Sequence, residues 1–254
     1  MDIATTLLIY TSLLGFILGY VVNKTNFCTM GAVSDLVNIG ETSRLKAWLL
    51  AITTAILGVT ILEFIGMVDV SDSRIPYRSS VFFWPRYIIG GIMFGIGMTL
   101  ASGCGNKILI RIGGGNIKSI VVLFIAGLMA LLMTRTDFYG LLFHSWMNPI
   151  SPDLAKIGIA DQSIQTIFAS LFSIQSSSII ITIFLPISIC LVLLKYIFLS
   201  GKRLTKDNLI SGFVVGLVVT FAWVLTGGEL GQAWIENNDF LDTPYPSVGV
   251  QSFT

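Results

Sequence analysis

The sequence predicts an all-α integral membrane protein, and both its composition and the spacing of its apolar runs point to that fold class. Of its 254 residues, 54% are hydrophobic and only 11% are charged, whereas soluble domains carry about 25% charged residues. The mean hydropathy is +0.84. Apolar runs of about 20 residues recur along the chain, which is the length that an α-helix needs to cross the hydrocarbon core. We therefore expect a multi-pass helical protein.

Six apolar runs are close to this length, and each is predicted to be a transmembrane helix. They cover residues 3–22, 46–66, 84–100, 117–133, 177–198 and 209–225. Residues 28–38 and 107–112 are too short to cross a membrane and are predicted to form re-entrant half-helices. The semi-apolar stretches 138–147 and 164–174 are expected to be interfacial or re-entrant.

Residues 1–254 are interpreted as a single transmembrane domain. The stretch 236–254 is polar and turn-rich, with Pro244 and Pro246. It has the character of a connecting loop, so we expect this chain to be the front part of something longer.

Glycines recur four residues apart in three of the predicted spans. This small-xxx-small spacing lets transmembrane helices approach closely. We therefore predict close helix packing at Gly15 and Gly19, at Gly91 and Gly95, and at Gly212 and Gly216.

Basic residues are unevenly distributed between the two predicted sides of the membrane. If the N-terminus lies outside, ten Lys and Arg residues fall on the inner segments: Lys24, Arg44, Lys46, Lys107, Arg111, Lys118, Lys195, Lys202, Arg203 and Lys206. Five fall on the outer segments: Arg74, Arg78, Arg86, Arg135 and Lys156. Because inner loops are enriched in Lys and Arg, the sequence favours this orientation.

Several function classes find no support in the sequence. The net charge of +1 and the lack of a basic patch with interleaved aromatic residues argue against nucleic-acid binding. Three scattered cysteines form no disulfide framework, and neither a CxxC pair nor a Cys/His cluster indicates a metal site. No cofactor is predicted. Cys190, inside an apolar run, is interpreted as a small buried core residue.

Two cysteine motifs carry the functional prediction. The strings NFCTMGAVSD (residues 26–35) and ASGCGNK (101–107), the latter running on to RIGGGN (111–116), each follow an apolar run. They combine a thiol with glycines, hydroxyls and amides, a mixture that lipid-facing helix does not tolerate but that suits the lining of a small polar passage. The predicted path residues are Cys28, Cys104, Thr29, Asn106, Lys107 and Arg111.

Each motif is expected to begin a short helix. Thr25 or Asn26 is the predicted N-cap of the first, and the second is expected to begin near Lys107. Helix N-termini carry partial positive charge and free N–H groups, so they favour anions. Broken helices that point at a site within the membrane are a recurrent transporter design. Lys107 and Arg111, four residues apart on one helix face, are expected to attract the anion.

The thiols leave three functional interpretations open. A neutral S–H is a weak donor and a soft, polarizable partner, so the leading interpretation is a permease for a small sulfur-containing anion rather than an enzyme. The alternative is a membrane-bound sulfurtransferase that works through a cysteine persulfide. A third interpretation is a structural subunit whose partner supplies the path.

The chain resembles the YeeE/YedE sulfur-transport family of bacterial inner-membrane proteins. The resemblance rests on FCTMGAVSD (27–35), on GIGMTLASGCGNK (95–107) and on RIGGGN (111–116). It implies uptake of thiosulfate or a related sulfur compound across the inner membrane. It also implies an hourglass-shaped path with Cys28 and Cys104 at the constriction, and a cytoplasmic partner, a small sulfur-carrier protein of the TusA type.

The sequence departs from the family pattern in one respect. Family members continue into a second half with a further cysteine motif, and no such motif follows here. Cys190 lacks glycine-rich surroundings and does not replace it. We therefore expect either a fragment or a short member that completes its path differently, for example with another chain.

Overall fold

The computed structural model describes residues 3–68, 80–159, 161–171, 179–200 and 204–238. The first half of these residues forms two successive groups of one long, one short and one long helix. The first triplet is α1 (Ile3–Thr25), α2 (Thr29–Ile39) and α3 (Ser43–Ile65), and the second triplet is α4 (Trp84–Leu100), α5 (Gly105–Gly113) and α6 (Ile117–Arg135).

Shorter helices and two further long ones follow. They are η2 (Gly140–His144), α7 (Ser145–Ile150), η3 (Leu154–Ile157), α8 (Ile164–Leu171), α9 (Ile179–Leu199), α10 (Lys206–Gly227) and α11 (Glu229–Asn238). Over the described residues no β-strand is formed, and only an isolated bridge joins Val81 to Asp153. The predicted all-α class is confirmed.

The predicted spans fall on helices. Among the described residues, five helical segments are long and apolar enough to cross a membrane, and they contain α1, α3, α4, α6 and α10. The sixth predicted span falls on α9, which contains Pro186 and a shorter apolar stretch over Ile183–Leu199. The start of that prediction, residues 177–178, lies outside the described residues. These helices make the chain a multi-pass membrane protein.

Local residues set where several helices begin and end. The side chain of Asn116 accepts a hydrogen bond from the Lys118 backbone N–H at the start of α6, and Thr205 does the same for Asn208 in α10. Gly40 and Gly66 end α2 and α3 with φ of 69° and 76°, a left-handed conformation that glycine adopts without strain. These caps account for the two turns that flank α3.

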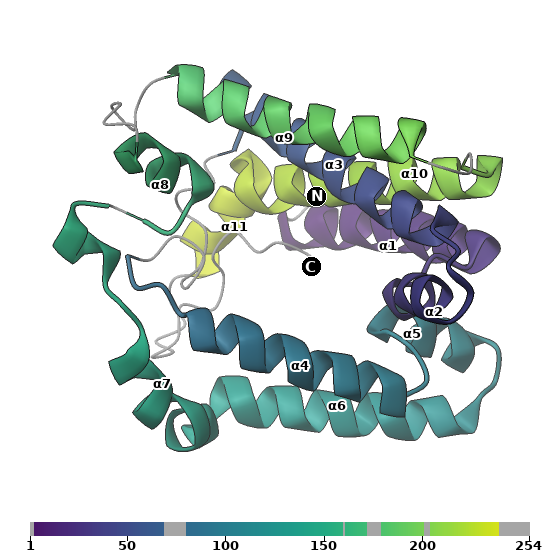
Figure 1. Ribbon diagram of the computed structural model, residues 1–254. Helices are drawn as coiled ribbons and strands as arrows, with labels where there is room; N and C mark the ends of the chain where they lie inside the picture. Colours follow the sequence, from purple (N-terminus) through teal and green to yellow (C-terminus); the bar gives the residue numbers. More distant parts are fainter. Residues whose placement is uncertain (1–2, 69–79, 160, 172–178, 201–203, 239–254) are drawn as a thin grey trace.

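The long helices fall into a packed bundle and a separate arm. α10 packs between α1 and α3, and α9 covers α3. The second triplet lies below this bundle in Figure 1, with α5 touching both α6 and α1. Both short helices, α2 and α5, lie at the same end of the molecule, on the right in Figure 1. The second triplet therefore meets the first through α5, which contacts α1.

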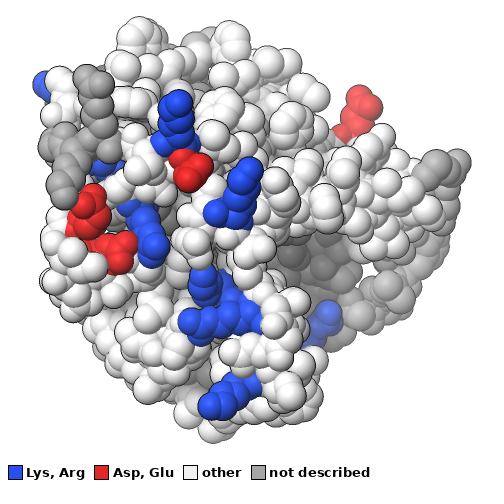
Figure 2. All heavy atoms as spheres, turned by 90° about the vertical axis from the view of Figure 1, so that its right-hand side faces the viewer, with Lys and Arg blue, Asp and Glu red and all other residues white. Residues whose placement is uncertain are grey.

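The same end of the molecule carries a group of basic side chains. Figure 1 shows that α1 and α4 end there while α3, α6 and α10 begin there. Figure 2 views this end directly and shows Lys and Arg side chains gathered on it. The grouping agrees with the predicted inner segments; Lys202 and Arg203 lie outside the described residues.

Only one of the three predicted glycine pairs is packed. A Cβ on Gly212 would lie 2.5 Å from the Ala47 carbonyl oxygen, and one on Gly216 would lie 2.7 Å from that of Ala51, so α10 and α3 are in close backbone contact. At Gly15, Gly19, Gly91 and Gly95 nothing lies within 4 Å. For these pairs the prediction of close packing is wrong among the described residues, and Gly15 instead lines an apolar cavity between α1 and α10.

Polar groups are part of the packed bundle. Lys46 is 1% exposed, and its Nζ donates a hydrogen bond to the carbonyl oxygen of Ser200, just after the end of α9. Cys190, also 1% exposed, donates to the Thr53 carbonyl oxygen at 3.8 Å. As predicted, Cys190 is a buried core residue.

Candidate functional site

Cys28 and Cys104 occupy the same structural position, the N-cap of a short helix. Cys28 precedes α2 with φ −158° and ψ 129°, and Cys104 precedes α5 with φ −73° and ψ 168°. Neither side chain makes a capping hydrogen bond. Each thiol is therefore held at a helix N-terminus without being used to stabilise it.

The predicted helix starts need correction. Thr25 belongs to α1, and its hydroxyl donates to the Val21 carbonyl oxygen at 2.8 Å. The side-chain oxygen of Asn26 accepts a hydrogen bond from Lys107 instead. Cys28 holds the N-cap position of α2, so the predicted cap was wrong. The second short helix begins at Gly105, two residues before Lys107.

The same backbone bend precedes both cysteines. Asn26 has φ 54° and Ser102 has φ 58°, and each stands two residues before its cysteine. Residues other than glycine rarely adopt this left-handed conformation, and asparagine tolerates it better than serine. The two bends turn the chain from a long helix into a short one in the same way.

The two thiols are in contact although 76 residues separate them. Cys28 Sγ lies 3.3 Å from Cys104 Sγ, and both cysteines are free. The backbone N–H groups of Met30 and Gly31 lie close to the Cys28 sulfur, and those of Thr29 and Lys107 lie close to the Cys104 sulfur. The pair thus lies in the positive field of two helix N-termini, which favours an approaching anion.

A basic pocket adjoins Cys28. Its volume is about 190 Å³, and three of its lining residues are cationic: Arg44, Lys107 and Arg111. Cys28 and Gly31 also line it, whereas Cys104, 8% exposed, lies behind Cys28. Such a concave cluster of one sign of charge raises the local concentration of counter-ions.

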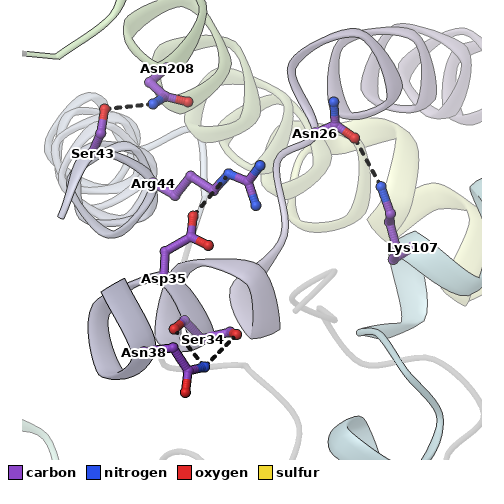
Figure 3. Close-up of polar contacts among 8 residues, drawn as sticks. All are labelled: Asn26, Ser34, Asp35, Asn38, Ser43, Arg44, Lys107 and Asn208. Atoms are coloured by element: carbon purple, nitrogen blue, oxygen red, sulfur yellow. Dashed lines mark hydrogen bonds and ion pairs between the residues drawn. The ribbon is translucent and has the colours of Figure 1, made fainter. Parts of the chain in front are cut away.

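Polar contacts hold this pocket together, as Figure 3 shows. Lys107 Nζ donates to Asn26 Oδ1 at 2.9 Å, which ties the second triplet to the first. Arg44 Nε lies 3.3 Å from Asp35 Oδ2, which ties the start of α3 to α2. Nearby, Asn208 Nδ2 donates to Ser43 Oγ at 2.7 Å and ties α10 to α3.

A second, mainly apolar cavity shares one lining residue, Gly103, with the basic pocket. It lies between α4, α5 and α6, has a volume of about 750 Å³ and is lined mainly by apolar side chains such as Met98 and Ile125. Gly103 and Gly105, the neighbours of Cys104 in the chain, line it as well. Gly103 lines both cavities, so they meet at the residue directly before Cys104, although neither thiol is among the residues that line the second cavity.

The predicted path residues divide into two sets. Cys28, Lys107 and Arg111 line the basic pocket, and Cys104 touches Cys28. Thr29 is the first residue of α2, and Asn106, in the first turn of α5, is exposed; neither lines the pocket.

Sequence reasoning missed Arg44 as a site residue. We had counted it only as a basic residue of the inner side, because 16 positions separate it from Cys28. Its position directly after the turn that ends the first half-helix was the available signal.

The sequence is similar to those of known sulfur-transport proteins. A family model described as sulphur transport matches residues 24–238. The thiosulfate transporter TsuA of Escherichia coli (strain K12) is 32% identical over 127 residues, which are 50% of this chain and 34% of that protein. The thiosulfate transporter TsuA of Spirochaeta thermophila is 27% identical over 109 residues, which are 42% of this chain and 31% of that protein.

Each match thus spans about a third of the relative's length. The family match, in contrast, takes in both cysteine bends and the helices around them. The chain therefore belongs to the sulphur transport family.

Proposed function

We propose that the protein is a permease that carries thiosulfate, or a closely related small sulfur anion, across a bacterial inner membrane, with residues 1–254 acting as one transmembrane domain. The observation that carries the proposal is the pair of thiols 3.3 Å apart beside a pocket lined by three cationic side chains. Similarity to two thiosulfate transporters supports this substrate.

In this proposal the pocket concentrates the anion and the thiols let it pass. Lys107 and Arg111 attract it, and the helix N-termini at Cys28 and Cys104 stabilise its charge. Neutral S–H groups are weak, soft donors. A weak partner suits conduction, because a site that held the ion tightly would not release it.

In this proposal the thiol pair is the narrow point of the path, and the support is that Gly103, next to Cys104, lines both cavities. Thr29 and Asn106 flank the cysteines in the first turns of α2 and α5, and we assign them to the walls of the path. Here the backbone must come close to the ion, which glycine on either side of Cys104 permits.

The basic end of the molecule is the proposed cytoplasmic end, and a small sulfur-carrier protein of the TusA type is its proposed partner. The orientation follows from the enrichment of Lys and Arg at that end. A carrier that receives the ion has to reach the basic pocket, which lies between α2 and α5 at this end. Crosslinking from Lys24 or Lys118 to a purified carrier tests the partner.

Uptake of radiolabelled thiosulfate by cells without another uptake route tests the function. We expect Cys28→Ala and Cys104→Ala each to lower uptake about tenfold or more, the size of effect that follows from losing a hydrogen bond to a charged group. Cys190→Ala is the matched control, because Cys190 is buried in the bundle at Thr53, and it should transport normally.

Two results would contradict the proposal. Near-normal uptake by a well-inserted Cys104→Ala protein would remove the thiol pair from the path. Mass spectrometry that found a sulfur adduct forming and decaying on Cys28 or Cys104 during turnover would favour the sulfurtransferase instead.

A further inference from the structure

Arg44 is the second residue of α3, yet its side chain reaches the pocket beside Cys28. We propose that Arg44, oriented by Asp35 and accommodated by Gly31, is the residue that binds the oxyanion end of the transported ion and sets the affinity for a doubly charged tetrahedral sulfur oxyanion. This inference rests on the proposed function, because it takes thiosulfate as the ligand.

The first support is the way in which Arg44 is held. Its Nε lies 3.3 Å from Asp35 Oδ2, and the two side chains are 40% and 24% exposed. A guanidinium has five N–H donors in a planar fork. When Asp35 occupies Nε, both terminal nitrogens remain to form a bidentate contact with an oxyanion, the geometry at which arginine excels.

The second support is the space left by Gly31. A Cβ at that position would lie 2.9 Å from Arg44 Nη1 and 3.6 Å from Cys28 Cβ. The terminal nitrogen of Arg44 therefore lies over the first turn of α2, close to the thiol. A side chain at position 31 would therefore require the guanidinium of Arg44 to move from this position.

The third support is the balance of charge. Arg44, Lys107 and Arg111 line the pocket, and Asp35 is paired with Arg44. Three cations and one carboxylate leave an excess of two positive charges among these four residues, which matches a dianion. An arginine that holds oxygens on one side and a soft thiol on the other would distinguish thiosulfate from sulfate, which has no terminal sulfur.

The test compares Arg44→Gln, Arg44→Lys and Gly31→Ala with Lys118→Gln. Lys118 is the matched control, because it is the second residue of α6 as Arg44 is of α3, but it is exposed and outside the pocket lining. We expect Arg44→Gln to raise the KM for thiosulfate about 10- to 100-fold and to change the maximal rate less. Gly31→Ala should shift KM in the same direction. Arg44→Lys should restore part of the affinity, because it keeps the charge without the fork.

A second readout needs no transport. Maleimide labelling of Cys28 in purified protein should be slowed by thiosulfate, and Arg44→Gln should raise the protecting concentration by the same factor as KM. If thiosulfate protects Cys28 equally in the parent and in all three variants, the inference about Arg44 is overturned while the proposed function stands. If thiosulfate neither protects Cys28 nor is taken up by the parent protein, the proposed function itself fails. A poorly folded Arg44→Gln protein leaves Gly31→Ala to decide.

Discussion

The two helix triplets begin with the same backbone design and end in different surroundings. In both, a long helix is followed by a residue in the left-handed conformation, Asn26 or Ser102. A cysteine at the N-cap position of a short helix comes two residues later. In the first triplet α3 then packs against α2, α9 and α10, whereas α6 in the second has its main contacts with α5. Phe94 on α4 and Phe124 on α6 are 62% and 71% exposed. Local sequence therefore specifies the bend, but neighbouring helices decide what is buried.

The largest expected difference in stability is between substitutions of a glycine in the packed bundle and of a glycine in the second triplet. Gly216→Leu should destabilise the protein by about 3 kcal/mol, because overpacking forces α10 away from Thr54 and the Ala51 carbonyl on α3. Gly95→Leu on α4 should change stability by less than about 0.5 kcal/mol, because nothing lies within 4 Å of a Cβ there. Thermal unfolding of the purified protein in detergent measures both. Equal losses of stability in the two variants would contradict the expectation that the face of α4 at Gly95 is open.

A smaller difference in stability is expected between substitutions of two lysines, Lys46 and Lys118, that lie in the first turn of the third helix of each triplet. Lys46→Met removes the donor to the Ser200 carbonyl at the end of α9 and should cost about 2 kcal/mol, since a hydrogen bond from a buried charged group is lost. Lys118→Met, at an exposed position of α6, should be nearly neutral. The same unfolding assay applies, and an unchanged stability of the Lys46→Met protein would mean that this hydrogen bond does not help to hold α9 against α3.

The smallest expected changes in stability are those on substitution at the two left-handed bends, and they should have opposite signs. Ser102→Gly should stabilise by about 0.5–1 kcal/mol, because glycine adopts φ 58° without strain. Asn26→Ala should destabilise by about 1 kcal/mol, because alanine tolerates the conformation poorly and the 2.9 Å bond from Lys107 is lost. Opposite signs in denaturant or thermal unfolding are the check, and a destabilised Ser102→Gly protein would contradict the strain at that bend.

Sequence reasoning found the elements of the site but placed them imperfectly. The sequence predicts the two cysteines, Lys107 and Arg111 as site residues, because a helix that faces lipid does not combine thiols, glycines and cations. The predicted cap of α2, Thr25 or Asn26, lies two or three residues before the observed N-cap Cys28, since the Thr25 hydroxyl bonds back into α1 and the Asn26 side chain bonds Lys107. Arg44 was missed because it reaches the pocket from the next helix.

By itself, the sequence determined the membrane class, the long helices and the two short helices that carry the cysteines. The hydropathy and the length of an apolar run are properties of one continuous stretch of residues, so they can be determined from the sequence alone. Tertiary structure alone decided that Cys28 meets Cys104, that Arg44 joins the pocket, and that Gly212 and Gly216 are packed while the other glycine pairs are open. Those outcomes depend on which helices pack against each other. The spacing of residues along one helix does not determine which other helix packs against it.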